Sequence, residues 1–199
     1  MGKRRITEDP LPRHHRLLRL LPYVLFVNAL TAGSVLSSGD DGHPVEIVFD
    51  AQDVAHVHAI VALSARPETV FAVLTDYARW PSLFGNGLIM AAIREDSEGV
   101  VTEMYVPRVL LPGTLHVIIR TRVHPPHDIE AELIRGDLNH FWRLWRLMPV
   151  AGGRQTRADL QMAVQPKTWA PQWVIRYGIE RELTDHFERL RVAVQRREG

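Results

Sequence analysis

The residues best suited to contact a bound molecule are two arginines set among tryptophans in residues 142–146, W-R-L-W-R. In a β-strand, side chains two positions apart point to the same face, which places Arg143 beside Trp145. On a cavity wall this pair could meet the headgroup or carbonyl of a ligand. Alternatively, one tryptophan belongs to the core and the arginines stack outside or pair with acids, because cations and aromatic rings are common neighbours. The sequence leaves both interpretations open.

Other reactive side chains are scattered along the chain. His56 and His58 share one face of a predicted strand and could ligate a metal, but no third ligand accompanies them, so a surface or edge position is predicted. Asp76 ends a predicted helix, where a cap or turn role is favoured over acid–base chemistry. The sequence contains no Gly-x-Ser-x-Gly elbow, phosphate-binding glycine loop or His-Glu-x-x-His helix. We therefore predict neither a catalytic residue nor a metal site.

The composition narrows the possible partners. The 24 basic and 23 acidic residues give a net charge of +1, without the basic excess that binding to nucleic acid requires. Cysteine is absent, which excludes disulfides, a thiolate nucleophile and cysteine-ligated zinc. No cofactor is predicted, and a monomer is expected.

The N-terminal residues differ from the rest of the chain. A basic region precedes an apolar stretch at residues 20–36, which is the layout of an export signal. The stretch is also near the lower limit of the ~17–25 residues that span a bilayer as a helix, so a retained anchor is the alternative. A helix docked on the domain would show a polar face, and this stretch shows none. We expect an export signal or membrane anchor at 1–36, a linker at 37–53 and a folded domain at 54–199, in the periplasm or on the outer side of the inner membrane.

The folded domain begins with a clear strand–helix sequence. A strand is predicted at residues 57–63, and Pro67 with Glu68 marks the start of a helix. Val70, Phe71 and Leu74 form its apolar face, and a second short helix follows from Trp80. Six further strands separated by short turns are predicted at residues 88–94, 100–109, 115–123, 129–134, 141–148 and 158–164. Alternating polar and apolar residues give this seven-stranded antiparallel sheet one dry face.

The last element is a long amphipathic helix predicted at residues 171–197. Its apolar residues recur at intervals of three and four: Ile175, Ile179, Leu183, Phe187, Leu190 and Val194. This helix can cover the dry face of the sheet. The expected fold class is therefore α+β.

The order of these elements resembles the START-like helix-grip superfamily, in its branch of polyketide cyclases and coenzyme Q-binding proteins. The resemblance spans about residues 55–197 and rests on the strand before A-R-P-E-T-V-F-A-V-L-T-D-Y-A-R-W-P-S-L-F, on Gly136 with W-R-L-W-R-L, and on the long last helix. It implies a curved sheet that grips the helix and leaves a cavity for a lipid, quinone or polyketide. The residues expected to bind this ligand are Met104, Val106, Val117, Ile119, Leu133, Arg143, Trp145, Ile179, Leu183 and Phe187.

Two functions follow from this resemblance. We expect a non-catalytic binding or carrier protein for a hydrophobic small molecule, a lipid or isoprenoid quinone, held at the membrane or outside the cytoplasm by the N-terminal segment. The alternative is an enzyme of the polyketide cyclase or aromatase type, which a His, Tyr, Asp or Glu on the dry face of a strand would favour. Glu103 and Tyr105 share a face, but it is opposite to that of Met104 and Val106. A third family role, ribosome association, is incompatible with export.

Overall fold

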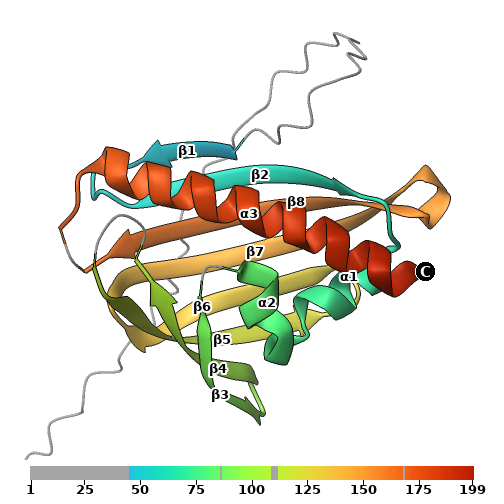
Figure 1. Ribbon diagram of the computed structural model, residues 1–199, viewed down its shortest axis with the longest axis horizontal. Coiled ribbons are helices and arrows are strands. Elements are labelled where there is room, and N and C mark those ends of the chain that lie inside the picture. Colours follow the sequence, from blue (N-terminus) through green and yellow to red (C-terminus); the bar gives the residue numbers. More distant parts are fainter. Residues whose placement is uncertain (1–44, 86, 109–111, 168) are drawn as a thin grey trace, which may run out of the picture. The chain divides into compact units, whose positions relative to one another are not determined.

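The computed structural model describes residues 45–199 except 86, 109–111 and 168. Its central feature is an antiparallel sheet of eight strands in the order β1-β2-β8-β7-β6-β5-β4-β3 (Figure 1). The strands are β1 (Val45–Phe49), β2 (Ala55–Leu63), β3 (Ile89–Asp96), β4 (Gly99–Pro107), β5 (Thr114–His124), β6 (Asp128–Gly136), β7 (Leu138–Val150) and β8 (Gln155–Pro166). The helix-grip fold is confirmed, and the sheet has eight strands where seven were predicted.

The additional strand is β1, which lies within residues 37–53, the range predicted to be a linker. That part of the prediction is wrong. The side chain of Asp50 organises the turn after β1 by accepting hydrogen bonds from the backbone N–H groups of Gln52 and Val54, each at 2.9 Å. This turn folds β1 back against β2, and Ile47 is buried in the core. The segment predicted as an export signal or anchor, and residues 37–44 of the linker, lie outside the described residues.

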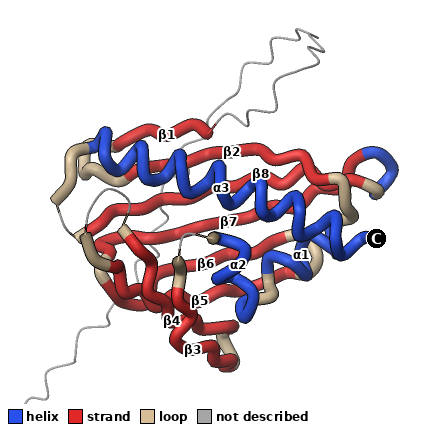
Figure 2. Tube along the Cα trace, viewed as in Figure 1, coloured by secondary structure: helices blue, strands red, loops and turns tan. Residues whose placement is uncertain are grey.

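The connection from β2 to β3 spans the width of the sheet, because β2 lies beside the edge strand β1 and β3 forms the opposite edge. It consists of α1 (Pro67–Leu74), the short 3₁₀ helix η1 (Tyr77–Arg79) and α2 (Trp80–Phe84). From β3 onward each strand pairs with the next until β8 returns beside β2, as Figure 2 shows. The two short helices predicted after the first domain strand are thus confirmed, and both lie on the side of the sheet that carries the last helix.

Pro67 and the side chain of Glu198 stabilise the start of the first helix. Pro67 occupies its first turn, where a missing N–H costs no hydrogen bond. Glu198, at the far end of the chain, accepts hydrogen bonds from the Arg66 backbone N–H at 2.9 Å and from the Thr69 hydroxyl at 2.6 Å. A carboxylate at this position satisfies unpaired donors and complements the positive end of the helix dipole.

The long helix α3 (Gln172–Glu198) lies across the sheet and also contacts α1 and α2 (Figure 1). Its buried side chains are Leu183, His186, Phe187, Leu190 and Val194. Four of these five belong to the predicted apolar stripe, and the exception is His186. None of the helices in the described part of the chain has the length and apolar character needed to cross a membrane.

Candidate functional site

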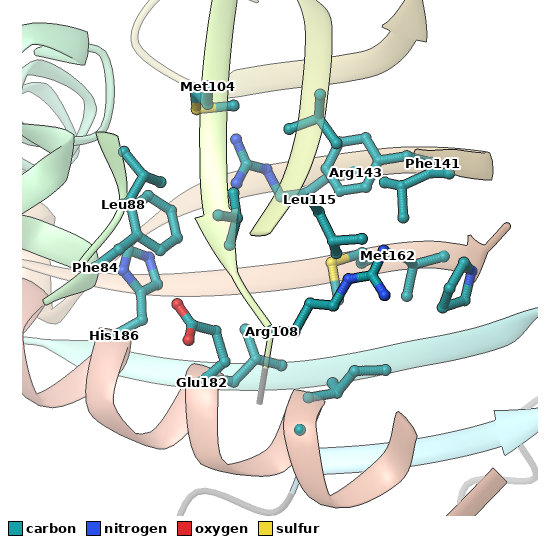
Figure 3. A pocket seen from close by; sticks show the side chains of 18 of the residues that line it. Phe84, Leu88, Met104, Arg108, Leu115, Phe141, Arg143, Met162, Glu182 and His186 are labelled. Carbon is teal, nitrogen blue, oxygen red and sulfur yellow. The ribbon is translucent and has the colours of Figure 1, made fainter. Parts of the chain in front are cut away.

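A pocket of about 300 Å³ lies between α3, α2 and the face of the sheet that they cover. Figure 3 shows side chains from the strands and from α3 converging on it. The lining is mainly apolar: Trp80 and Phe84 from α2, Met104 and Val106 from β4, Leu115, Val117 and Ile119 from β5, Phe141 and Trp145 from β7, Leu160, Met162 and Val164 from β8, and Val174, Ile175, Ile179 and Leu183 from α3. The polar side chains at its wall are Arg108, Arg143, Glu182 and His186.

Eight of the ten residues predicted to bind the ligand line this pocket: Met104, Val106, Val117, Ile119, Arg143, Trp145, Ile179 and Leu183. Leu133 and Phe187 do not. Phe187 is 1% exposed and packs with its ring centroid 6.1 Å from that of Trp145, so it belongs to the solid core behind the pocket. Leu133 is partly buried against the same core and does not reach the pocket. Whether the eight lining residues bind a ligand stays a prediction.

The structure combines features of both interpretations of the Trp-Arg cluster, since Trp145 is 2% exposed and belongs to the core while it also lines the pocket. Arg143 and Trp145 both face the pocket, whereas Arg146 is exposed on the other face of β7. Trp142 lies with its indole N–H donating a hydrogen bond to the carboxylate of Glu130 at 2.7 Å. The arginine expected to meet a headgroup is thus the one that the fold places inside.

A row of aromatic side chains in contact with one another lies on the side of the pocket opposite the sheet. The Trp80 ring packs edge-on against Tyr77 at 5.0 Å and against Phe84 at 5.5 Å between centroids. Phe84 in turn stacks on the imidazole of His186, with centroids 4.3 Å apart and planes 7° from parallel. The Trp80 indole N–H donates to the Leu74 carbonyl at 3.0 Å, which fixes the ring at the end of α1. The guanidinium of Arg143 lies over this ring, 5.2 Å from its centroid.

Burial shapes the electrostatics of Arg143. Loss of water around the guanidinium lowers its pKa to about 10, an effect that the nearby Tyr77 opposes. The side chain therefore remains charged at neutral pH, and its accessible part opens onto the pocket. Its Nε atom has no hydrogen-bond partner in the described part of the chain, nor does any carboxylate there form an ion pair with it. Arg143 is a cation facing a mainly apolar space.

His186 is the residue that the sequence analysis missed. It is 2% exposed, and burial, with a smaller effect of the positive Arg143, lowers its pKa to about 3 despite a hydrogen bond to the Leu83 backbone. The imidazole is therefore neutral at physiological pH, and its Nδ1 atom has no partner among the described residues. A signal was present: Ile179, Leu183 and Leu190 place His186 in their own apolar stripe, at spacings of four, three and four. The prediction for a cyclase concerned acid–base residues on the dry face of a strand, whereas His186 lies on a helix.

The other candidate residues lie away from the pocket. Glu103 and Tyr105 are on the opposite face of β4, where the His116 imidazole stacks on Tyr105 at 4.8 Å and its Nε2 atom lies 2.8 Å from the Glu103 carboxylate. His56 pairs with Asp50 at 2.9 Å and His58 with Asp159 at 3.4 Å. No cluster of three or more potential metal ligands occurs within the described residues.

Asp76 belongs to a surface ion-pair network. Its carboxylate lies 3.4 Å from the Arg79 side chain and 3.9 Å from that of Arg197. The contact with Arg197 connects the segment after α1 to the last turn of α3, so Asp76 helps to hold the two helices together. Its side chain makes no capping hydrogen bond to η1.

The fold and the pocket define a START-like, helix-grip protein, and comparisons with known proteins agree. The family described as "Polyketide cyclase / dehydrase and lipid transport" matches residues 63–191, and the chain belongs to this family. A search of curated proteins gives no significant match.

Solved structures share the fold at low sequence identity. The chain is similar to the Zhui aromatase/cyclase from Streptomyces sp. R1128, with a TM-score of 0.60 and 15% identity over 72% of this chain and 95% of the other. It is also similar to a START superfamily protein from Mycobacterium smegmatis, with a TM-score of 0.59 and 17% identity over 71% of this chain and 97% of that one. At such identities the likeness concerns the fold alone.

Proposed function

We propose that this protein binds or carries a hydrophobic small molecule, a lipid or isoprenoid quinone, in the pocket between the sheet and α3, and that it does so without catalysis. The observation that carries this proposal is the pocket itself. Its volume of about 300 Å³ is at the small end of the range for ligand sites, ~300–1,000 Å³, and its lining is mainly apolar with a few polar groups. Membership of a family that includes lipid transport supports the same function.

A cyclase or aromatase activity is the second candidate, and His186 is the observation in its favour. A histidine at a pocket wall with a free ring nitrogen could move a proton during ring closure. However, an efficient general base has a pKa near the working pH, and the pKa of His186 is lowered to about 3. The electrostatics therefore favour binding over proton transfer.

Thermal melting of the full chain with a panel of quinones, phospholipids and fatty acids tests the binding function. A ligand that binds only the folded state raises Tm by an amount that grows with RT ln(1 + [L]/Kd). Leu183→Trp places a large ring in the pocket and should abolish the shift, at a cost of ~1–3 kcal/mol in stability from overpacking. Val192→Trp, on the exposed side of the same helix, is the matched control and should keep the shift.

Mass spectrometry of compounds extracted from protein purified from its native host complements this experiment. A co-purified hydrophobic compound that is recovered unchanged after incubation supports a carrier, whereas conversion that is lost in His186→Leu supports an enzyme. If no compound shifts Tm and none co-purifies, the binding function is wrong.

The proposed place of action is the periplasm or the outer side of the inner membrane, with residues 20–36 as export signal or anchor. Support comes from the basic region before this apolar stretch, since positive charge stays on the cytoplasmic side. A reporter fused after Gly199 should be active only outside the cytoplasm. Reporter activity confined to the cytoplasm contradicts the proposal.

A further inference from the structure

We infer that the pocket selects an anionic amphiphile, whose oxyanion pairs with Arg143 while its apolar part fills the rest of the pocket. This inference rests on the proposed binding function and names the class of ligand. Among the ligands proposed above, it favours a lipid with a free carboxylate, such as a fatty acid, over a neutral lipid or quinone, which would leave Arg143 without an oxyanion.

The first argument is the balance of charge at the pocket wall. The ionisable side chains that line it are Arg108, Arg143, Glu182 and His186. His186 is neutral at physiological pH because burial and Arg143 lower its pKa. The nearby Tyr77 hydroxyl also stays neutral, because burial raises its pKa. Two arginines against one glutamate give the lining a net positive charge, and none of the described carboxylates pairs with Arg143.

The second argument is energetic. A cation withdrawn from water without a counter-charge lowers the stability of the folded protein, so an anion that reaches it gains more than a surface ion pair does. The guanidinium donates in a planar fork that matches the two oxygens of a carboxylate. In the described structure its Nε–H donor is buried and has no partner. An oxyanion would supply that acceptor.

The third argument is the geometry around Arg143. Its guanidinium lies 5.2 Å from the centroid of the Trp80 ring and 6.0 Å from that of Phe141, so aromatic faces hold it in place. Figure 3 shows Arg143 extending from β7 between Met104 and Leu115, with Met162 and Phe141 beyond it. Apolar side chains thus surround the charge, and a ligand that reaches it must place an apolar body against them.

Calorimetric titration of the full chain with decanoate and with decanol at pH 8 tests the inference, since the two compounds share a chain length and differ in charge. Wild type should bind decanoate about 10- to 100-fold more tightly, which is the range for hydrogen bonds to a charged group. Arg143→Met, which keeps the length of the side chain and removes its charge, should lose this preference and still bind decanol. The matched control Arg146→Met, on the exposed face of the same strand, should retain the preference.

The outcomes separate the two proposals. If wild type binds both compounds equally, or if Arg143→Met keeps the preference for decanoate, the inference about the anion is wrong while the binding function stands. If neither compound nor any other apolar compound binds, the binding function itself fails. Even if Arg143→Met does not fold, the comparison of the two ligands on wild type tests whether the pocket prefers the anion.

A second, independent observation concerns the start of α3 and the segment just before it. Trp169, Trp173 and Tyr177 are 85%, 66% and 42% exposed, and they are called here the aromatic stripe. Trp173 and Tyr177 are four residues apart on the helix and share one face. Arg181 continues that face, and its Nη1 atom donates to the Tyr177 hydroxyl at 3.4 Å. These three rings are largely exposed to solvent, so packing within the domain does not explain their position.

We propose that the aromatic stripe docks on the surface of a phospholipid bilayer. Tryptophan and tyrosine favour the membrane–water interface because each joins an apolar ring to a polar tip. Lys167, Arg176 and Arg181 lie around the stripe and can pair with lipid phosphates, while Asp53, Glu180 and Asp185 beside them balance their charge. Ala170 and Val174, which alternate with the stripe, line the pocket. Docking here would bring the pocket next to the lipid phase.

Quenching of tryptophan fluorescence by brominated lipid in phosphatidylcholine–phosphatidylglycerol vesicles tests this docking in the full chain. Wild type should be quenched, and the double variant Trp169→Phe/Trp173→Phe should lose most of the quenching, because the other tryptophans are buried or partly buried. Ile89→Ala, which truncates an exposed apolar residue on β3, should leave the quenching unchanged. Vesicle binding without quenching would overturn the proposal, and so would self-association that depends on the stripe.

Discussion

The imidazole of His186 stacks on the phenyl ring of Phe84, 4.3 Å between centroids and 7° from parallel, and this contact ties α3 to α2 at the pocket wall. The Leu83 backbone accepts a hydrogen bond from the same imidazole. Protonation of this imidazole is unfavourable in the folded protein, because burial and the positive Arg143 lower its pKa to about 3. The contact therefore links the integrity of the pocket wall to pH.

Stability should fall on acidification because of His186. Burial lowers its pKa from 6.5 to about 3, so below pH 6.5 the unfolded chain binds a proton that the folded protein does not. The free energy of unfolding should decrease between pH 6.5 and about 3, by at most ~1.4 kcal/mol per pH unit from this group. Urea unfolding at several pH values measures the effect as the difference between wild type and His186→Phe. His140→Gln, which replaces an exposed histidine, is the control variant.

Two residues on the apolar face of α1, Leu74 and Phe71, should contribute unequally to the free energy of unfolding. Leu74 is buried in the core, whereas Phe71 is only partly buried against it. Leu74→Ala should cost ~2–5 kcal/mol through lost burial and the cavity left behind, and Phe71→Ala should cost less than the ~3–5 kcal/mol of a fully buried phenylalanine. Denaturant midpoints of both variants measure this. Equal midpoints for Leu74→Ala and wild type would show that α1 does not pack on the sheet as described.

At the end of β6, the backbone conformation and the close approach of β5 allow only glycine at position 136. Its φ is +144°, and a Cβ atom there would lie 2.3 Å from the backbone carbonyl oxygen of His116. Gly136→Ala should destabilise the protein more than the ~1–3 kcal/mol typical of backbone strain alone. Gly152, with φ +67° and open space around it, is the control, and its alanine variant should lose only ~1–2 kcal/mol. Similar thermal shifts in both variants would contradict the close approach of β6 to β5.

Glu198 should protect the first turn of α1. Its hydrogen bonds with the Thr69 hydroxyl and the Arg66 N–H lower its pKa below the ordinary value for glutamate. Stability from this contact is present above that ordinary value and is lost as pH falls through the lowered one. In Glu198→Gln at neutral pH, the Arg66 amide should exchange its hydrogen faster. Unchanged exchange there, with Glu188→Gln as a control on the exposed face of α3, would show that the C-terminal residue does not cap α1 in solution.

The sequence by itself determined most of the framework, because its signals are local. Alternation along each strand and the spacing of Ile179, Leu183 and Leu190 predict a dry sheet face and a helix that covers it. Pro67 marked the start of α1, and the pairing of Arg143 with Trp145 on one face followed from the two-residue period of a strand. These features need only neighbours within a few positions.

Only the tertiary structure decided what depends on contacts between distant segments. The strand β1 is short and lies in the range predicted to be a linker, because its stability comes from pairing with β2 and from burial of Ile47. Phe187 lies in the core against Trp145, whereas the adjacent His186 lies at the pocket wall with its imidazole stacked on Phe84. The environment of the Arg143 charge depends on Trp80, 63 positions earlier in the chain, whose ring it contacts. It depends also on the lack of a described carboxylate partner. Burial and charge balance are properties of the assembled pocket, so no local pattern in the sequence specifies them.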